Sequence, residues 1–166
     1  MIDSSRYAVL TEFGKKLSNR PSLEDGLVLI ADAAKELLGA KRCSIYVYDA
    51  ANNQLWTTLA DGIQKIILPA NEGLAGHTIK EKKPIISNDP YSDPRFFKDI
   101  DQKSGFVTNN IATAPVFSSQ RKVIGVLQLL NKEEGFTNED SKFMIFFAHY
   151  ISSYLELASM YGEINE

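Results

Sequence analysis

Asn131-Lys-Glu-Glu-Gly-Phe136-Thr-Asn-Glu-Asp140 closes the run of sequence that decides the fold of this chain, and Gly73-Leu-Ala-Gly-His77 opens it. Two polar stretches lie between these ends: Asp89-Pro-Tyr-Ser-Asp-Pro-Arg-Phe96 and Asp101-Gln-Lys-Ser-Gly-Phe-Val-Thr108. With their glycines, short polar side chains and single aromatic residues, these pieces look like the wall of a small-molecule pocket. The run contains no obvious catalytic set, so the sequence favours a binding module over an enzyme.

Helical and strand patterns surround this run. Apolar residues recur at helical spacing over 4–19 and 22–38, and Ser22 and Gly39 predict the start and the end of the second helix. Asp93-Pro94 is a further helix start signal. Helices are also expected over 72–82 and after 137, and strands over 43–48, 55–59, 65–68, 84–87, 111–117 and 122–130. Paired strands flanked by helices at both ends predict an α+β fold with an antiparallel sheet.

The last helix carries two apolar stripes. One follows heptad spacing, and the other runs beside it. The first contains Phe143, Phe147, Tyr150, Tyr154, Leu157, Tyr161 and Ile164, and the second contains Met144, Ala148, Ile151, Leu155 and Ala158. Either one stripe covers the sheet while the other meets the helix of a second copy, or a single wide face covers the core as far as residue 158. Tyr161 and Ile164 are harder to bury within one domain, which favours a homodimer through the terminal helices.

Composition limits the classes of function. The chain has 166 residues, 23% of them charged, and a net charge of −3, which disfavours a general nucleic-acid surface. One cysteine, Cys43, and two histidines supply neither a disulfide framework nor a Cys/His zinc site, so no metal site is expected. No apolar stretch reaches the roughly 18 residues of a membrane span, and the N-terminus lacks a signal-peptide pattern. We therefore expect a cytoplasmic domain with no membrane partner.

The motifs of the opening run resemble those of a GAF domain, of the type found in cyclic-nucleotide phosphodiesterases and bacterial sensory proteins. The resemblance covers residues 22–160, with a helix or linker over 1–21 before it and a helical extension over 161–166 after it. The Asn-Lys, Phe and Asp positions of the family signature match Asn131, Lys132, Phe136 and Asp140, whereas its final Glu is replaced by Ser141. The resemblance implies a GAF/PAS-like six-stranded antiparallel sheet with the terminal helices on one face and a ligand pocket on the other.

The resemblance also implies the residues that line the pocket. These are Ser44, Asp61, Leu74, Ala75, Phe97, Asp101, Ser104, Thr108 and Gln128. The helix that starts at Gly73 either offers its N-terminus to an anion or uses glycine only for turn geometry. Phe97 lacks the hydroxyl of a tyrosine found in some relatives, Ala60 replaces a frequent aromatic residue, and Gln128 stands where some nucleotide binders have an acid. These departures argue against cyclic GMP in particular as the ligand.

Asn131, Lys132, Phe136 and Asp140 are expected to form a structural lock outside the pocket. The lock would join the last strand to the last helix through an ion pair between Lys132 and Asp140. Such a pair is strongly destabilising to break when it is buried and contributes little when it is exposed.

The sequence therefore predicts a sensory domain that binds a small molecule, with cyclic AMP or cyclic GMP as the candidate ligand, and signals through its terminal helices. No other cofactor is expected. The alternative is a ligand-free structural dimerisation domain of a larger signalling protein. Catalysis of the sulfoxide-reductase type needs several cysteines, and a bilin photoreceptor needs a cysteine in the pocket loops, which residues 73–110 lack. Any activity is expected in an attached effector domain.

Overall fold

A six-stranded antiparallel sheet forms the centre of the computed structural model, which describes residues 4–19, 21–60, 67–96 and 107–161. Its strands lie in the order β3-β2-β1-β6-β5-β4. Their bounds are Ala40–Asp49 for β1, Gln54–Ala60 for β2, Ile67–Pro69 for β3, Ile85–Ser87 for β4, Ile111–Phe117 for β5 and Val123–Lys132 for β6. The predicted α+β class and the predicted sheet are confirmed.

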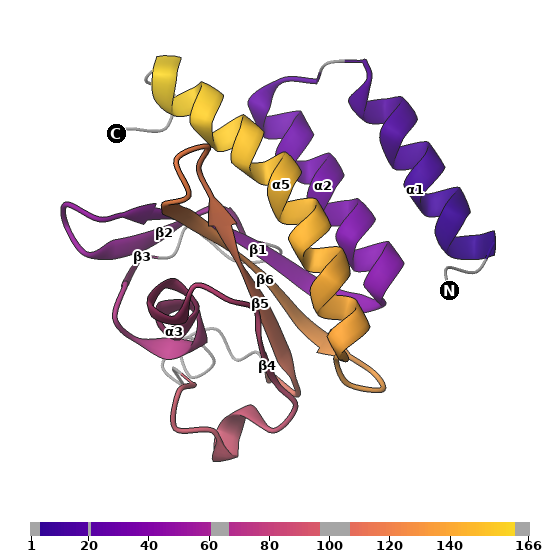
Figure 1. Ribbon diagram of the computed structural model, residues 1–166. Coiled ribbons are helices and arrows are strands. Elements are labelled where there is room, and N and C mark those ends of the chain that lie inside the picture. The colour runs from indigo at the N-terminus through magenta and orange to yellow at the C-terminus, as the bar shows by residue number, and fades with distance from the viewer. Residues whose placement is uncertain (1–3, 20, 61–66, 97–106, 162–166) are drawn as a thin grey trace.

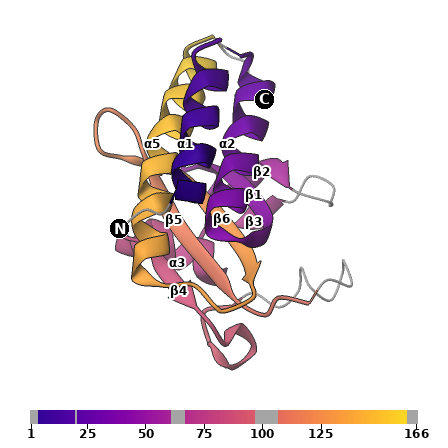
Figure 2. The same ribbon diagram turned by 90° about the vertical axis from the view of Figure 1, so that its right-hand side faces the viewer.

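Three helices cover one face of the sheet and one short helix lies on the other (Figures 1 and 2). The three are α1 (Ser4–Leu17), α2 (Leu23–Leu38) and α5 (Asn138–Tyr161), and the fourth is α3 (Gly73–Glu81). The Ser22 hydroxyl accepts the amide of Asp25 to cap α2, and Gly39 ends this helix in the left-handed region at φ +71°. Among the described residues, no helix is both long and apolar enough to cross a membrane.

At the expected helix start, Asp93-Pro94, the structure has a turn over Pro94 and Arg95. A single 3₁₀ turn begins at the preceding Asp-Pro pair, at Pro90 after Asp89. At Asp93 the carboxylate instead accepts the backbone amide of Arg95 at 2.9 Å and pairs with its guanidinium at 2.7 Å. This local pairing favours a turn at Pro94 and Arg95. Residues 97–106 lie outside the described part of the chain.

The sheet has apolar side chains on both faces. The larger core lies under the three helices and includes Ile45, Leu127 and Leu129 of the central strands. On the opposite face two smaller clusters form beneath α3, one around Tyr46 and Val126 and the other around Ile85, Ile111 and Leu130. Because successive strand residues point to opposite faces, the alternation along β6 accounts for this division.

The heptad stripe of α5 is covered within the chain as far as Tyr154. Phe13 of α1 packs edge-to-face on Phe147 and Tyr150, with ring centroids 5.5 and 5.2 Å away. Tyr154 lies against the bare backbone of Gly26 in α2. The single wide core-facing helix therefore explains this part of the stripe, and α1 and α2 occupy the place that a partner helix would need. Leu157 remains 53% exposed, and residue 164 lies outside the described residues.

Gly76 allows α3 to pack closely on the turn before it. A methyl group at this position would lie 2.8 Å from the Ala70 carbonyl oxygen and 2.9 Å from the carbonyl carbon of Asn71. We predict that Gly76→Ala lowers the free energy of unfolding by about 1–3 kcal/mol, measured by urea denaturation, because the backbone must shift.

Gly14 offers a matched control. It is an exposed helical glycine, and a methyl group there would meet nothing within 4 Å. Gly14→Ala should therefore stabilise the protein by about 0.5–1 kcal/mol. If Gly76→Ala proved equally stabilising, the close approach of α3 to the turn would be refuted.

Candidate ligand-binding site

A row of polar side chains crosses the sheet on the face covered by α3. Ser44 of β1 pairs with Gln128 of β6, and Gln128 pairs with Thr113 of β5, so the three side chains lie side by side on the same face. The Thr113 hydroxyl lies 2.5 Å from that of Thr78 on α3. We call Ser44, Tyr46, Thr78, Thr113 and Gln128 the polar row.

Tyr46 brings a buried hydroxyl to the polar row. Its ring is fully buried against Val126 and Ala75, and its hydroxyl hydrogen-bonds with the side chains of Gln128 and Ser44. Burial raises the pKa of Tyr46 to about 12, and the two hydrogen bonds oppose this shift only in part. The phenol is therefore neutral near pH 7, and every member of the row is uncharged.

The chemistry of the polar row suits the uncharged, polar part of a ligand. Hydroxyl and amide groups both donate and accept hydrogen bonds, so they can match the edge of a heterocycle. Ser44, Tyr46, Thr78 and Thr113 are buried, whereas Gln128 is half-buried and is the most accessible member. Among the described residues, no group of His, Cys, Asp or Glu side chains could hold a metal ion.

Leu74 and Ala75 lie on α3 above the sheet, and both are buried. Leu74 packs with Ile85 and Leu130, and Ala75 packs in the cluster of Tyr46. The helix starts at Gly73 with φ +73°, and no side chain caps it, since Glu72 makes no capping bond. Gly73 thus provides the turn from which α3 starts. Leu74 and Ala75, which were expected to line the ligand, pack α3 against the sheet.

The other expected pocket residues fall into two groups. Thr108 is buried just before β5, in a segment that is bound to the end of β6. Asp61, Phe97, Asp101 and Ser104 lie outside the described residues. The structure brings Ser44 and Gln128 together, as expected for one site.

Sequence reasoning missed three members of the row. Tyr46 carries its hydroxyl on the same alternating face of β1 as the expected pocket residue Ser44, and this alternation was the available signal. Thr113 joins the row only through its cross-strand register with Gln128. Thr78 has no such signal, because only the packing of α3 on β5 brings it to the row.

The expected lock is present as a buried ion pair. Lys132 Nζ lies 2.7 Å from Asp140 Oδ2, and the same oxygen accepts the backbone amide of Thr137 at 2.9 Å. In return, the Thr137 hydroxyl accepts the amide of Asp140, which completes a reciprocal cap at the start of α5. One carboxylate thus joins the last strand to the last helix.

Side-chain amides extend this contact to two other segments. Asn131, at φ +64°, accepts the Asn109 amide at 2.6 Å and donates to the Val107 carbonyl at 2.9 Å. Asn88, after β4, forms two hydrogen bonds with the backbone of the buried Phe136. We call Asn131, Lys132, Phe136 and Asp140 the clasp, because together they tie β6, α5, β4 and residues 107–110 at one point.

The charge of Asp140 is the part of the clasp that mutation can test. Asp140 is 1% exposed, so Asp140→Asn keeps the shape and leaves the buried Lys132 without its counter-ion. We predict a loss of about 3–5 kcal/mol in the free energy of unfolding, measured by urea denaturation.

The neighbouring Glu139 provides the control. It pairs with Arg6 at 2.6 Å, but its side chain is 51% exposed, so Glu139→Gln should cost at most about 1 kcal/mol. Equal losses for the two variants would contradict a buried, structurally required pair.

Comparison with known proteins agrees with this geometry. The GAF domain family model matches residues 22–155. A probable 3′,5′-cyclic phosphodiesterase from Caenorhabditis elegans is 28% identical over 158 residues, which cover 86% of this chain and 22% of that protein. The chain therefore spans about a fifth of the length of this relative.

Two solved structures show the same fold. The GAF domain of a phosphoenolpyruvate-protein phosphotransferase from Coxiella burnetii has a TM-score of 0.84 at 21% identity, covering 96% of this chain and 97% of that one. Free methionine-R-sulfoxide reductase from Neisseria meningitidis, in complex with its substrate, has a TM-score of 0.77 at 16% identity, covering 96% and 95%. The match of the family model over most of the chain shows that it belongs to the GAF domain family, whose members are typically regulatory modules that bind small molecules.

Proposed function

We propose that this domain is a sensory module that binds a cyclic nucleotide, cyclic AMP or cyclic GMP, over the polar row and signals through its terminal helices. The observation that carries the proposal is the uncharged, largely buried row that Ser44, Gln128 and Thr113 form across three neighbouring strands. Catalysis is not part of this role, and any enzymatic activity belongs to an attached effector domain.

A purine base fits the chemistry of the row. Its edge presents fixed donors and acceptors, and the Gln128 amide together with nearby hydroxyls offers both kinds of partner. Gln128 is half-buried and has donor and acceptor capacity beyond its bond with Tyr46. A ligand that covers this amide without a matching edge would leave it unpaired, at a cost of about 1–3 kcal/mol. The similarity to a probable cyclic phosphodiesterase supports a nucleotide over other heterocycles.

Strand β6 offers a direct route from ligand to helix. Gln128 lies in the polar row, and Asn131 and Lys132 at the end of the same strand belong to the clasp that holds α5. A ligand can shift the position of α5 only if it binds two arrangements of the domain with different affinity. A ligand that contacts Gln128 would favour one arrangement of the clasp, because only a few residues of β6 separate the two.

Calorimetry and thermal unfolding with each nucleotide test the proposal. A nucleotide present at 100 times its Kd should stabilise the domain by about 2.7 kcal/mol. Gln128→Leu should weaken binding at least about tenfold, because it removes the most accessible donor and acceptor of the row. Gln54→Leu makes the same change at an exposed position of β2 and should leave binding unchanged. Absence of stabilisation by either nucleotide at millimolar concentration would remove the cyclic-nucleotide proposal.

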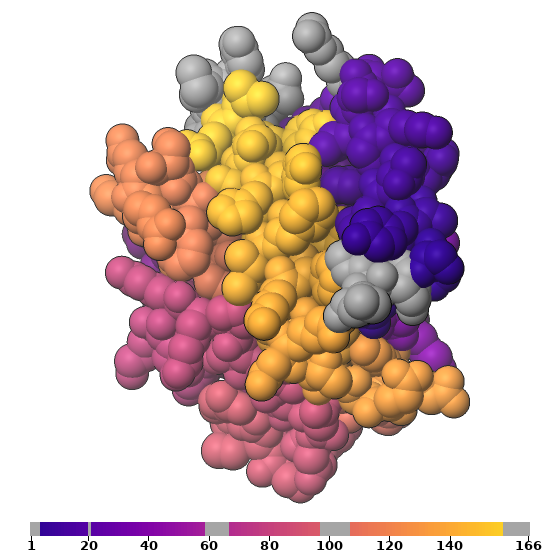
Figure 3. Space-filling view, turned by 45° about the vertical axis from the view of Figure 1, so that its right-hand side comes forward, coloured from indigo at the N-terminus to yellow at the C-terminus, as the bar shows by residue number. Residues whose placement is uncertain are grey.

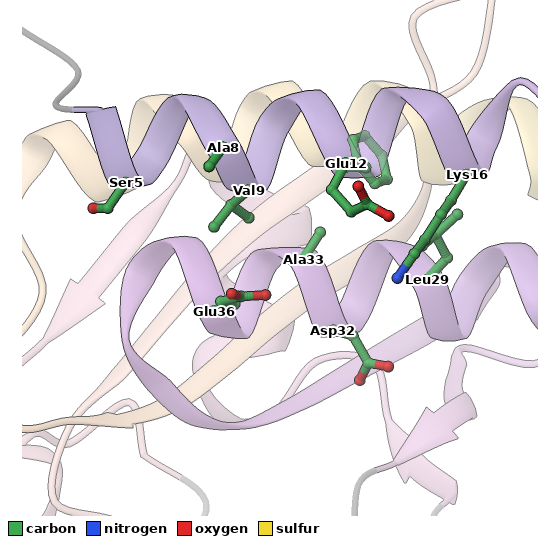
Figure 4. Close-up of a pocket in the computed structure, with 10 residues that line it drawn as sticks. Ser5, Ala8, Val9, Glu12, Lys16, Leu29, Asp32, Ala33 and Glu36 are labelled. Atoms are coloured by element: carbon green, nitrogen blue, oxygen red, sulfur yellow. The ribbon is translucent and has the colours of Figure 1, made fainter.

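Homodimerisation through the helical layer is a second part of the proposal. The layer exposes Tyr7, Phe146 and Leu157. The groove between α1 and α2, about 330 Å³, is lined by apolar residues such as Val9 and Leu29 and by charged residues such as Glu12 and Lys16 (Figure 4). Exposed apolar groups rimmed by charged ones are typical of a protein interaction face.

Light scattering at tens of micromolar tests this interface. The domain should have the mass of a dimer, and Leu157→Glu should reduce it to a monomer, because a charge would enter the apolar contact. Ile67→Glu places the same charge on the exposed edge strand β3 and should remain dimeric. A monomeric wild-type domain would rule out the homodimer of this isolated chain.

A further inference from the structure

A cationic cleft lies away from the polar row, at the edge of the sheet just before β4 begins. The charged residues that line it are Lys82 and Lys83, which follow α3, and Arg121 in the β5–β6 turn. His149 on α5 supplies a further basic side chain. Apolar groups line the rest, among them Phe117 and Ile145, and the cavity measures about 230 Å³. In Figure 3 the orange β5–β6 turn and the magenta-to-pink residues after α3 lie along the same flank of α5.

The shortness of β4 creates this cleft. β4 pairs with β5 only from Ile111 to Thr113, so the later residues of β5 have no β4 residue paired beside them. Pro84 and Pro115 lie at this open edge and have no backbone amide to donate. The edge is therefore protected against a further strand, while its surface stays accessible to a smaller group.

Two of the cations occupy backbone positions that disfavour them. Four non-glycine residues among those described have positive φ: Asn53, Asn131, Lys82 at +57° and Arg121 at +65°. Asparagine tolerates this region, whereas lysine and arginine do so at a cost. The chain uses glycine at the same kind of position at the end of α2, where Gly39 stands. Both unfavourable residues line the same cleft, which suggests that their side chains are retained for a contact there.

The surrounding contacts hold the turn in place and leave the charges available. Glu156 of α5 accepts the Ser119 amide and hydroxyl, both at 2.9 Å. The Arg121 guanidinium lies 5.4 Å from the centre of the Phe117 ring. Glu81 lies 3.6 Å from Lys83 and offsets part of its charge, whereas no ion pair of Lys82 or Arg121 is found within the described residues.

We propose that the cationic cleft is a second binding site, for a small organic anion that carries a phosphate or carboxylate on a single flat apolar ring. Lys82 and Arg121 would bind the anionic group, and Phe117 and Ile145 would contact the ring. A cavity of about 230 Å³ is smaller than the roughly 300–1,000 Å³ of common ligand pockets, so a one-ring body fits better than a nucleotide. Because His149 and Ile145 belong to α5, a ligand here would contact that helix without involving the clasp.

Isothermal titration at low ionic strength with phenyl phosphate tests the site. We expect one molecule bound per chain, with a Kd below about 1 mM that weakens as salt is added. Inorganic phosphate, which lacks the ring, should bind at least about tenfold more weakly, and benzyl alcohol, which lacks the charge, should give no binding. No heat with phenyl phosphate, or equal affinity for phosphate alone, would overturn the proposal.

Glycine substitution separates the function of the cations from their structural effect. Arg121→Gly and Lys82→Gly should each raise the melting temperature by about 2–4 °C, because glycine relieves the left-handed backbone, and should weaken phenyl phosphate binding at least about fivefold. Lys122→Gln removes one charge from the same turn without altering the cleft lining and should change affinity less than about twofold. If Lys122→Gln lost as much affinity as Arg121→Gly, the binding would be non-specific charge attraction and the site would be refuted.

Discussion

The pairing of β6 with β1 on one side and β5 on the other is the constraint on which the rest of the structure depends. Its register places Ser44, Gln128 and Thr113 in one line on the face beneath α3, and places Leu127 and Leu129 in the core beneath α1, α2 and α5. A slip of one residue would exchange the two faces, burying the amide of Gln128 under the helices and turning leucines towards α3. The same strand ends in Lys132, so register also determines whether the clasp can close on Asp140.

Sequence reasoning succeeded where the signal is local. The cap at Ser22 and the end of α2 at Gly39 depend on residues close along the chain, and the Lys132–Asp140 pair was expected from the resemblance to the GAF signature. It was less informative where tertiary packing decides. The row requires the cross-strand register and the docking of α3, which bring Tyr46 and Thr78 to residues far away in sequence. Likewise, the stripe of α5 is apolar whether its neighbour is α1 and α2 or a second copy, and only the fold distinguishes these alternatives.

The two proposed sites differ in the chemistry that they offer to a ligand. The polar row is neutral and buried, because burial keeps the phenol of Tyr46 protonated, and it suits directional hydrogen bonding to an uncharged edge. The cationic cleft lies at the sheet edge with solvent nearby, and it suits an anion held by charge. Both sites are connected to α5. The polar row is connected through β6 and the clasp, and the cationic cleft is lined directly by residues of α5. The helical layer is thus the element that two different ligands could influence.

The most direct test of the central claim follows the side-chain amides of Gln128 and Asn131 by ¹⁵N NMR during titration with cyclic AMP and cyclic GMP. Gln128 reports contact at the polar row, and Asn131, three residues further along β6, reports the clasp. We predict that a saturating nucleotide shifts the signals of both amides and slows exchange of the Gln128 amide with solvent. Unchanged Gln128 and Asn131 signals at saturation, with shifts confined to surface residues elsewhere, would contradict it.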